Sequence, residues 1–236
     1  MSSKTGILTG ASGGLGIAIA RKLSPICERL IVTSSSVEKL EQLQARLTQE
    51  FPKLKVDTFK ADLADRGEID AFCEFITQNC SDIDFLINNA AKFSVKSISE
   101  TNYNLLTKDF HINVYAPFLL SKALVESAKD LDGKHLIFIG SSSAYGASAN
   151  TSVYSATKHS LLGVSRAFDA EYRGKGLRTL FVAPGSIQTD MGRQVEGQNF
   201  STFIEPEDLA EFVRYNLTLG SNMILNEVRV NRMQYE

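Results

Sequence analysis

The sequence predicts an α/β protein in which a parallel sheet is covered by helices on both faces. Three observations support this fold class: apolar, strand-like segments alternate with helical patterns, a glycine-rich turn follows the first such segment, and no repeat or long linker interrupts the alternation. Strand and helix in strict alternation produce parallel strands joined by right-handed helical crossovers. We therefore expect a doubly wound sheet in a three-layer α/β/α arrangement.

The expected elements follow from hydrophobic periodicity. In one helical pattern Val37, Leu40, Leu43 and Leu47 share a face opposite charged residues. Five further helices are expected. One begins at the glycine-rich turn and one includes Ile69 and Ile76. The other three occupy residues 111–129, the segment after residue 152, and residues 205–219. Seven strands are expected at residues 4–9, 29–33, 55–60, 84–87, 134–140, 177–183 and 227–233.

Bulk composition favours one domain over residues 1–236 and excludes several classes of partner. A chain of 236 residues with 43% apolar content is long enough for one core and short for two. With 25 basic and 27 acidic residues, the formal charge of -2 gives no electrostatic case for nucleic acid or an anionic membrane. No apolar stretch could span a membrane and no signal peptide is evident, so we expect a cytoplasmic protein.

The three cysteines suggest no metal or disulfide chemistry. Cys27, Cys73 and Cys80 are odd in number and none forms a CxxC pair. Neither a disulfide framework nor a zinc site is therefore expected.

The glycine-rich turn joins the first strand to the first helix and is suited to a dinucleotide. Gly10, Gly14 and Gly16 lie between a strand and a helix, an order that presents backbone N–H groups and a helix N-terminus to a pyrophosphate. The spacing departs from the commonest GxGxxG fingerprint, and a tight structural turn would use the same glycines.

The end of the second strand bears on the choice of cofactor. This position commonly carries an acidic residue in NAD-binding folds, whereas Ser34, Ser35 and Ser36 occupy it here. Serine hydroxyls can donate to a phosphate and no carboxylate repels it, which favours NADP(H) over NAD(H). Ser36 could alternatively serve only to cap the next helix.

A tyrosine and a lysine four residues apart form the candidate catalytic pair. Tyr154 and Lys158 lie on the same face of the predicted helix, and an ammonium beside a phenol favours the phenolate and lowers its pKa from about 10. Such a tyrosine can exchange a proton with a substrate oxygen. The alternative is a half-buried ring beside a lysine that extends to solvent.

Polar residues also follow two central strands. Asn88 and Asn89 end the fourth strand, and Ser141, Ser142 and Ser143 end the fifth, at the edge where ligands bind in open α/β sheets. Asn113 lies among apolar neighbours in a helix, so its amide needs partners.

Together these motifs resemble the short-chain dehydrogenase/reductase family, of the compact type with TGxxxGxG and YxxxK motifs and a Rossmann-type fold. The resemblance extends from Thr9 to the last strand. It rests on the glycine turn, an aspartate and an Asn-Asn-Ala segment after two strands, a buried asparagine, a strand-end serine, the Tyr-Lys pair, and a Pro-Gly-xxx-Thr segment: Gly10, Gly14, Gly16, Asp62, Asn88, Asn89, Ala90, Asn113, Ser141, Tyr154, Lys158, Pro184, Gly185 and Thr189.

The resemblance implies specific roles. Tyr154 would be the acid and base, Lys158 would hold the nicotinamide ribose, and Asn113 would order a water that connects Lys158 to solvent. Asp62 would bind adenine and Asn88 would steady the strand near the adenosine ribose. The implied cofactor contacts, besides Tyr154 and Lys158, are Gly10, Ser12, Gly14, Leu15, Gly16, Ser34, Ser35, Asp62, Leu63, Asn89, Ala90, Pro184, Gly185, Ile187 and Thr189, the last two at the carboxamide.

The family pattern leaves three points open. Its spacing selects Ser141 as the catalytic serine, although Ser143 has the glycine three residues later that often follows the family's serine; we choose Ser141. Ala91 replaces the glycine usual after Asn-Asn-Ala. Gly13 lies where NADP enzymes often carry a basic residue, which leaves the cofactor choice open.

The predicted function is hydride transfer between NADP(H) and a small-molecule carbonyl or alcohol, with a ketone, aldehyde or 3-oxoacyl compound as substrate. A catalytically silent dinucleotide-binding regulator and an isomerase or epimerase of the same fold are the alternatives. Residues 190–204 would form a short substrate lid, or merely a connector. Family members commonly pair through the helices of Asn113 and Tyr154, so the resemblance implies a homodimer or homotetramer. The apolar face of Val114, Phe118 and Leu119 is compatible with that pairing and equally with packing on the sheet.

Overall fold

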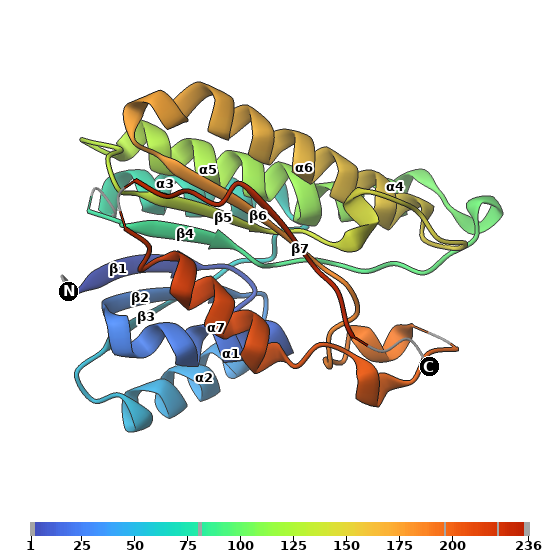
Figure 1. The fold of residues 1–236 in the computed structure, drawn as a ribbon, viewed down its shortest axis with the longest axis horizontal. Coiled ribbons are helices and arrows are strands. Elements are labelled where there is room, and N and C mark those ends of the chain that lie inside the picture. Colours follow the sequence, from blue (N-terminus) through green and yellow to red (C-terminus); the bar gives the residue numbers. More distant parts are fainter. Residues whose placement is uncertain (1–2, 80–81, 196, 221, 234–236) are drawn as a thin grey trace.

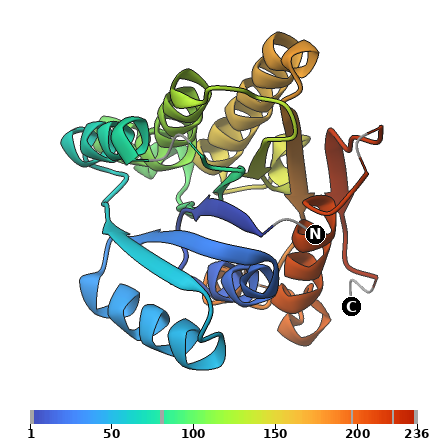
Figure 2. The ribbon, with the colours of Figure 1, turned by 90° about the vertical axis from the view of Figure 1, so that its left-hand side faces the viewer.

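The computed structural model describes residues 3–79, 82–195, 197–220 and 222–233, and these form three layers. A central sheet lies between one layer that contains α3, α5 and α6 and another that contains α1, α2 and α7 (Figure 1). Viewed along the sheet, the two helical layers lie on opposite faces (Figure 2). The predicted fold class is therefore confirmed.

All pairs of neighbouring strands in the seven-stranded sheet are parallel, and the strand order is β3-β2-β1-β4-β5-β6-β7. The order reverses between β1 and β4, which opens a crevice at the carboxyl ends of these strands. The bounds are β1 Lys4–Leu8, β2 Cys27–Ser34, β3 Lys55–Lys60, β4 Phe85–Asn88, β5 His135–Ile139, β6 Arg178–Pro184 and β7 Glu227–Val230. Each predicted strand is present, with ends that differ by up to three residues.

The helices connect these strands. The α2 helix begins after Ser36, whose hydroxyl accepts a hydrogen bond from the Lys39 N–H, so the predicted cap is confirmed. Seven α-helices are assigned in the described residues: α1 Gly14–Leu23, α2 Val37–Glu50, α3 Arg66–Asn79, α4 Tyr103–Phe110, α5 Ala116–Ser127, α6 Ser152–Tyr172 and α7 Pro206–Asn216.

Both faces of the sheet are buried, which explains the continuous apolar runs in its central strands. In β4, Leu86 packs into the core on the side of α3, α5 and α6, whereas Phe85 and Ile87 pack on the side of α1, α2 and α7. Successive side chains of a strand point to opposite faces, so one short strand contributes to both cores.

The expected uninterrupted helix over residues 111–129 is wrong. The structure has α4 up to Phe110, a π-helical segment at His111–Tyr115, and then α5 from Ala116. Two features account for the wider turn. Pro117 has no N–H to donate to the carbonyl of Asn113 four residues earlier, and the Asn113 side chain bonds to the backbone of a distant loop. Single-turn π segments are frequent at functional sites.

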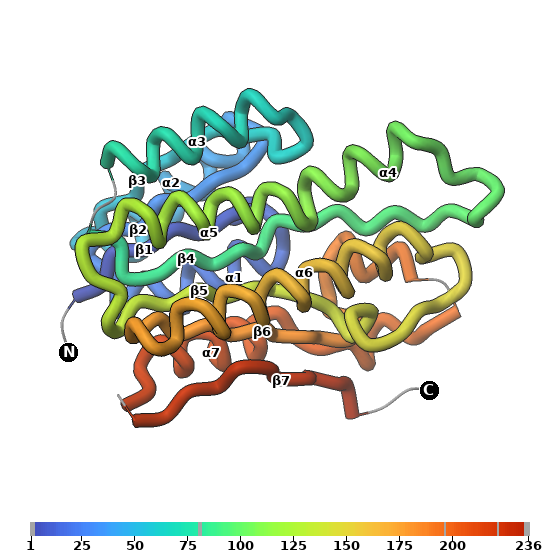
Figure 3. The backbone as a smooth tube through the Cα atoms, turned by 90° about the horizontal axis from the view of Figure 1, so that it is seen from above, coloured from blue at the N-terminus to red at the C-terminus, as the bar shows by residue number. Residues whose placement is uncertain are grey.

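The loops that follow β4, β5 and β6 extend past the same end of the sheet (Figure 3). Two of them are directly joined, because the Lys96 N–H donates to the Asn150 carbonyl over 2.7 Å and Lys96 forms an isolated parallel bridge with Thr151. The carboxyl edge of the sheet therefore carries joined loops, and the predicted site residues Asn89, Ala90, Ser141, Gly185, Ile187 and Thr189 lie on the segments that follow β4, β5 and β6.

Candidate active site

The glycine-rich turn between β1 and α1 forms a cradle that side chains would fill. Gly10 has a φ of +63°, and a Cβ atom there would lie 2.7 Å from the Ala90 Cα. A Cβ atom on Gly16 would collide with the Gly10 carbonyl oxygen. Gly13 precedes α1 without a side-chain cap, and the first turn contains no acidic residue, so the helix N-terminus remains suited to an anion.

Asn89 and Thr9 fix this turn to the end of β4. The Asn89 amide donates to the carbonyls of Thr9 and Gly10 over 2.9 and 3.1 Å. The Thr9 hydroxyl accepts from the backbone N–H groups of Asn89 and Ala90, each over 3.0 Å. Asn89 and Ala90 are thus beside the cradle as predicted, with the Asn89 side chain used to shape it.

Serine hydroxyls meet at the end of β2. The hydroxyls of Ser12 and Ser34 are 2.6 Å apart, which joins the glycine turn to β2. Ser34 is buried, whereas the neighbouring Ser35 is exposed. The two strand-end serines differ accordingly: Ser34 faces the cradle, and Ser35 is accessible from solvent.

Asp62 and Leu63 follow β3 in the order that the family pattern requires. Asp62 Oδ1 accepts from the Ala64 N–H over 2.9 Å, and Leu63 is buried in the core. Asp62 does not cap the next helix, because Asp65 Oδ1 accepts the Glu68 N–H of α3. The Leu63 side chain packs in the interior, so a ligand would contact its backbone.

Ser141 and Tyr154 lie together at the carboxyl edge. Ser141, after β5, and Tyr154, in the first turn of α6, are close enough for the serine side chain to act against the raised pKa of the phenol. The Ser141 hydroxyl also accepts from the Ser143 N–H over 3.1 Å at the start of a 3₁₀ turn, Ser142–Ala144. Among the three serines, Ser141 is the one whose side chain acts on the pKa of the tyrosine.

Lys158 lies below the tyrosine on the same helix and is almost completely buried. Its Nζ atom donates to the Ile139 carbonyl over 3.1 Å and is 5.6 Å from the centroid of the Tyr154 ring. Only 1% of Lys158 is exposed. An ammonium in this position is desolvated, and one fixed backbone acceptor compensates part of the cost.

The expected lowering of the tyrosine pKa is wrong for this arrangement. Burial raises the pKa of Tyr154 to about 12, while the hydrogen bond from Ser141 acts in the opposite direction. Burial also lowers the pKa of Lys158 to about 7. The sequence shows the spacing of the pair but not its burial, and desolvation outweighs the attraction between the two groups.

Asn113 uses its side chain to connect the π segment to two neighbours. Its Oδ1 accepts the Lys92 N–H over 2.8 Å, and its Nδ2 donates to the Lys92 carbonyl over 2.9 Å and to Thr157 Oγ1 over 3.0 Å. The predicted partners of this buried amide therefore exist. Both amide hydrogens are occupied, so the side chain itself has no further donor to offer a water.

Three residues near the site were missed by the sequence reasoning. Thr157 accepts from Asn113 and donates to the Tyr154 carbonyl over 2.7 Å. Lys92 binds Asn113 through its backbone, and the Phe93 ring lies 4.8 Å from the Tyr154 ring at an interplanar angle of 79°. Lys92 and Phe93 directly follow the Asn-Asn-Ala-Ala segment, and this adjacency was the available signal.

The segment after β6 returns to the glycine cradle. The Gly185 N–H donates to Val230 of β7, which holds the strand end. A Cβ atom on Gly14 would lie 2.9 Å from Thr189 Cγ2, so Thr189 packs directly against the start of α1. Ile187 forms an isolated bridge with Ile204. The structure thus brings Pro184, Gly185, Ile187 and Thr189 to the same edge as Tyr154.

The expected lid over residues 190–204 contains two 3₁₀ turns, Gly192–Gln194 and Phe200–Thr202. The Arg193 guanidinium lies 4.1 Å from the Phe200 ring centroid. Glu196 falls outside the described residues. The bridge at Ile187 and Ile204 joins the two ends of this segment.

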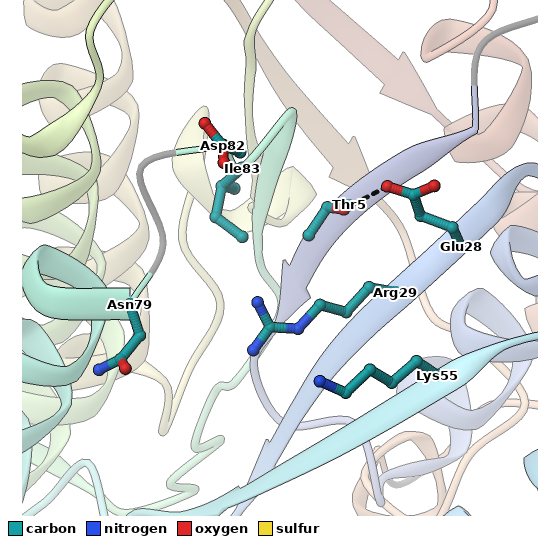
Figure 4. Close-up of a pocket in the computed structure, with 7 residues that line it drawn as sticks. All are labelled: Thr5, Glu28, Arg29, Lys55, Asn79, Asp82 and Ile83. Atoms are coloured by element: carbon teal, nitrogen blue, oxygen red, sulfur yellow. Dashed lines mark hydrogen bonds between the residues drawn. The ribbon is translucent and has the colours of Figure 1, made fainter.

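A separate hollow of about 380 Å³ lies at the amino ends of β1, β2 and β3, opposite the candidate site (Figure 4). Charges of both signs line it, with Arg29 and Lys55 bound to Asp57 and with Glu28 and Asp82 nearby. This mixture selects no ligand charge, and no residue of the proposed chemistry faces it.

The described part of the chain contains no candidate for a membrane-spanning helix or a metal site. Its helices include none long and apolar enough to cross a membrane. Within the same residues, no three His, Cys, Asp or Glu side chains gather in a group that could hold a metal ion. Cys80, one of the three cysteines considered above, lies outside the described residues.

Known proteins are similar to this chain in sequence and in fold. A family model for short chain dehydrogenases matches residues 4–199. An uncharacterized oxidoreductase of Staphylococcus aureus strain USA300 is 24% identical over 230 residues, which cover 98% of this chain and 97% of the relative. An alcohol dehydrogenase from the archaeon Thermococcus sibiricus, complexed with 5-hydroxy-NADP, has a TM-score of 0.87 at 24% identity and covers 100% of this chain and 98% of its own.

A further solved structure is a blue fluorescent protein from a metagenomic library in complex with NADPH. It has a TM-score of 0.84 at 27% identity, with 97% of this chain and 95% of that chain covered. These similarities agree with the order of motifs along the chain. The protein belongs to the short chain dehydrogenase family and is an oxidoreductase of that family.

Proposed function

We propose that the protein is an NADPH-dependent carbonyl reductase. The observation that carries this proposal is the grouping of Ser141, Tyr154 and Lys158 at one edge of the sheet: Ser141 acts on the pKa of the Tyr154 phenol, and the buried Lys158 has its Nζ atom 5.6 Å from the centroid of the tyrosine ring. Two hydroxyls at this edge can both reach one carbonyl oxygen, and one of them can deliver a proton.

The chain's own residues fit a dinucleotide. Gly10 and Gly16 keep the cradle free of side chains, the uncapped start of α1 offers N–H groups to a pyrophosphate, and Thr189 lies against Gly14. Asn88 Oδ1 is a buried acceptor without a partner among the described residues, and its Nδ2 donates to Ser121. We propose that these groups hold the pyrophosphate, the adenosine and the carboxamide as the family pattern implies.

The proposed mechanism assigns a task to each residue. The nicotinamide, when bound, supplies the hydride. Ser141 donates a hydrogen bond to the substrate's carbonyl oxygen, Tyr154 donates the proton that this oxygen takes up, and Lys158 stabilises the resulting phenolate. Asn113 holds the π segment in place, and we propose that a water ordered there connects Lys158 to solvent, from which the Tyr154 phenolate takes up a proton through Lys158 and regains its acid form.

The preference for NADPH rests on the strand-end serines. Ser12 and Ser34 form a neutral pair of hydroxyls, 2.6 Å apart, with the exposed Ser35 beside them. Hydroxyls can donate to a ribose phosphate and present no negative charge to repel it. The Thermococcus and metagenomic proteins in their solved complexes hold 5-hydroxy-NADP and NADPH, which supports the same choice.

The tyrosine pKa fits the role of an acid. Because burial raises this pKa to about 12, the phenol is protonated at neutral pH. Reduction of a carbonyl needs an acid at this position, whereas oxidation of an alcohol needs a base. We therefore propose that Tyr154 is poised at neutral pH to act as the acid of carbonyl reduction.

The experiment is a titration of the purified protein with NADPH and with NADH, followed by a panel of ketones, aldehydes and 3-oxoacyl thioesters. Tighter binding of NADPH together with turnover supports the reductase. Tight NADPH binding without turnover on any member of the panel would instead favour a silent dinucleotide-binding regulator, and an isomerisation without net oxidation of NADPH would favour an isomerase.

We also propose a homodimer or homotetramer, with residues 190–204 as the substrate lid, in a single cytoplasmic domain of residues 1–236. Of the predicted contact residues, Val114 is buried within the chain and Leu119 packs against the core, so they do not form an outer face. Tyr115 of the π segment and Phe118 of α5 remain 47% and 43% exposed. A monomer by light scattering at micromolar concentration would contradict this assembly.

A further inference from the structure

We propose that Phe93 selects for carbonyl compounds that carry an aromatic or flat conjugated group. This inference rests on the proposed function, because it assigns the side of the reductase site against which the substrate packs. Among the described residues, Phe93 is the aromatic residue whose ring contacts the ring of Tyr154, at 4.8 Å and nearly perpendicular to it.

The position of Phe93 is fixed from both sides. Lys92 is bound to Asn113 through its N–H and its carbonyl, over 2.8 and 2.9 Å. Its ammonium lies 3.8 Å from the completely buried carboxylate of Asp109. Three residues after Phe93 in the chain, Lys96 is joined to Asn150 and Thr151. Phe93 is therefore presented to the site without a rearrangement of its loop.

The Phe93 ring lies beside the tyrosine that a substrate must reach. A carbonyl oxygen that bonds to Tyr154 has its carbon substituents within a few ångströms of that hydroxyl, and Phe93 contacts the same tyrosine. Phe93 is only half-buried, so part of its ring remains available for contact. Aromatic rings prefer offset or perpendicular packing with another ring, which an aliphatic group cannot provide.

The aromatic side chains of the expected lid are already engaged. The Phe200 ring is covered by Arg193 and the Phe203 ring by Arg232, at 4.1 and 5.2 Å from the guanidinium carbons. Phe203 is also buried. This leaves Phe93, beside the reacting tyrosine, as the aromatic surface that the described part of the site offers.

The test compares benzaldehyde with cyclohexanecarbaldehyde, which have the same number of carbons and differ in the flat ring. With NADPH, kcat/KM is measured for both aldehydes on the unaltered protein, Phe93→Leu, Phe93→Met and Phe93→Tyr. For each protein, kcat/KM for benzaldehyde is divided by kcat/KM for cyclohexanecarbaldehyde. Comparison of this ratio between a variant and the unaltered protein cancels the intrinsic reactivity of the aldehydes. Phe110→Leu is the matched control, because its ring packs near Tyr115 rather than Tyr154.

The aromatic-to-aliphatic ratio is expected to fall about 2- to 12-fold in Phe93→Leu and Phe93→Met, the range for loss of one aromatic pair. It is expected to stay the same in Phe93→Tyr and Phe110→Leu, with the NADPH Kd within twofold throughout. An unchanged ratio in the Leu and Met variants would overturn the proposal.

The failure of this proposal and that of the reductase assignment are distinguishable. If the unaltered protein binds NADPH and reduces other carbonyls of the panel but neither aldehyde, the substrate class proposed here is wrong. If it does not bind NADPH, the proposed function itself fails.

Discussion

The Asn113 amide donates to the Thr157 hydroxyl over 3.0 Å, and this bond joins the π segment to the helix of the candidate catalytic pair. Thr157 in turn donates to the Tyr154 carbonyl. Asn113 also holds the backbone of Lys92, next to the Phe93 ring that contacts Tyr154. Asn113 is thus connected to Tyr154 by two sets of contacts, one through Thr157 and one through the Lys92 backbone and Phe93. The position of the tyrosine therefore depends on one buried amide.

Replacement of Asn113 by leucine tests this dependence. The change removes three hydrogen bonds and leaves buried partners on Lys92 and Thr157 unsatisfied. We expect Asn113→Leu to lower the free energy of unfolding by about 2–4 kcal/mol, and Thr157→Val by about 1 kcal/mol. Urea denaturation of the three proteins measures both. Equal stability of Asn113→Leu and the unaltered protein would show that the amide does not hold the two elements together.

The pH dependence of reduction reports on Lys158. Burial lowers its pKa to about 7, so the ammonium loses its proton as the pH rises through that value. If the charge stabilises the Tyr154 phenolate, kcat for reduction falls above about pH 7. In Lys158→Met the rate should be low and without this inflection. Persistence of the same inflection in that variant would assign it to another group.

His135 is expected to make the fold sensitive to acid. Burial lowers its pKa from 6.5 to about 3. Between these values the unfolded chain binds a proton that the folded chain does not, so stability is complete above pH 6.5 and is lost as the pH falls towards 3. At pH 5 the loss is about 2 kcal/mol. Denaturant unfolding of the unaltered protein and His135→Gln at pH 7.5 and 5 should show a smaller loss in the variant.

Ser34 tests the cofactor preference. An aspartate at this position would place a negative charge beside the Ser12 hydroxyl, where we propose that the ribose phosphate binds. Ser34→Asp is expected to raise the Kd for NADPH at least about tenfold, because a charge repulsion of about 1.4 kcal/mol changes a dissociation constant by a factor of ten. NADH, measured on the same variant, serves as the control. A parallel weakening of both cofactors would indicate a distorted cradle rather than repulsion.

The strands and the order of the site could be predicted because they depend on local patterns. Buried parallel strands are continuous apolar runs, and their carboxyl ends meet at one edge, so Ser141 and Asn89 could be placed there from the sequence. The π segment could not, because the partner of Asn113 is Lys92, at a sequence separation of 21 residues. The hydrophobic periodicity of the helix carries no information about that contact.

The chemistry of the pair was harder to predict than its position. Tyr154 and Lys158 could be paired from helical spacing, but the direction of the tyrosine pKa depends on the amount of water that neighbouring elements exclude. Phe93 contributes to that exclusion from another loop, and its place beside the tyrosine follows from tertiary contacts alone. Burial is a property of the whole fold, so a spacing of four residues cannot reveal it.

Tyr154→Phe, measured in a single turnover, tests the central claim most directly. The variant loses the hydroxyl that would donate the proton and keeps the ring against Phe93. With NADPH bound, we expect its affinity for the cofactor to be unchanged and its rate of NADPH oxidation by a carbonyl substrate to fall at least about 10²-fold. A rate close to that of the unaltered protein would contradict the assignment of Tyr154 as the acid.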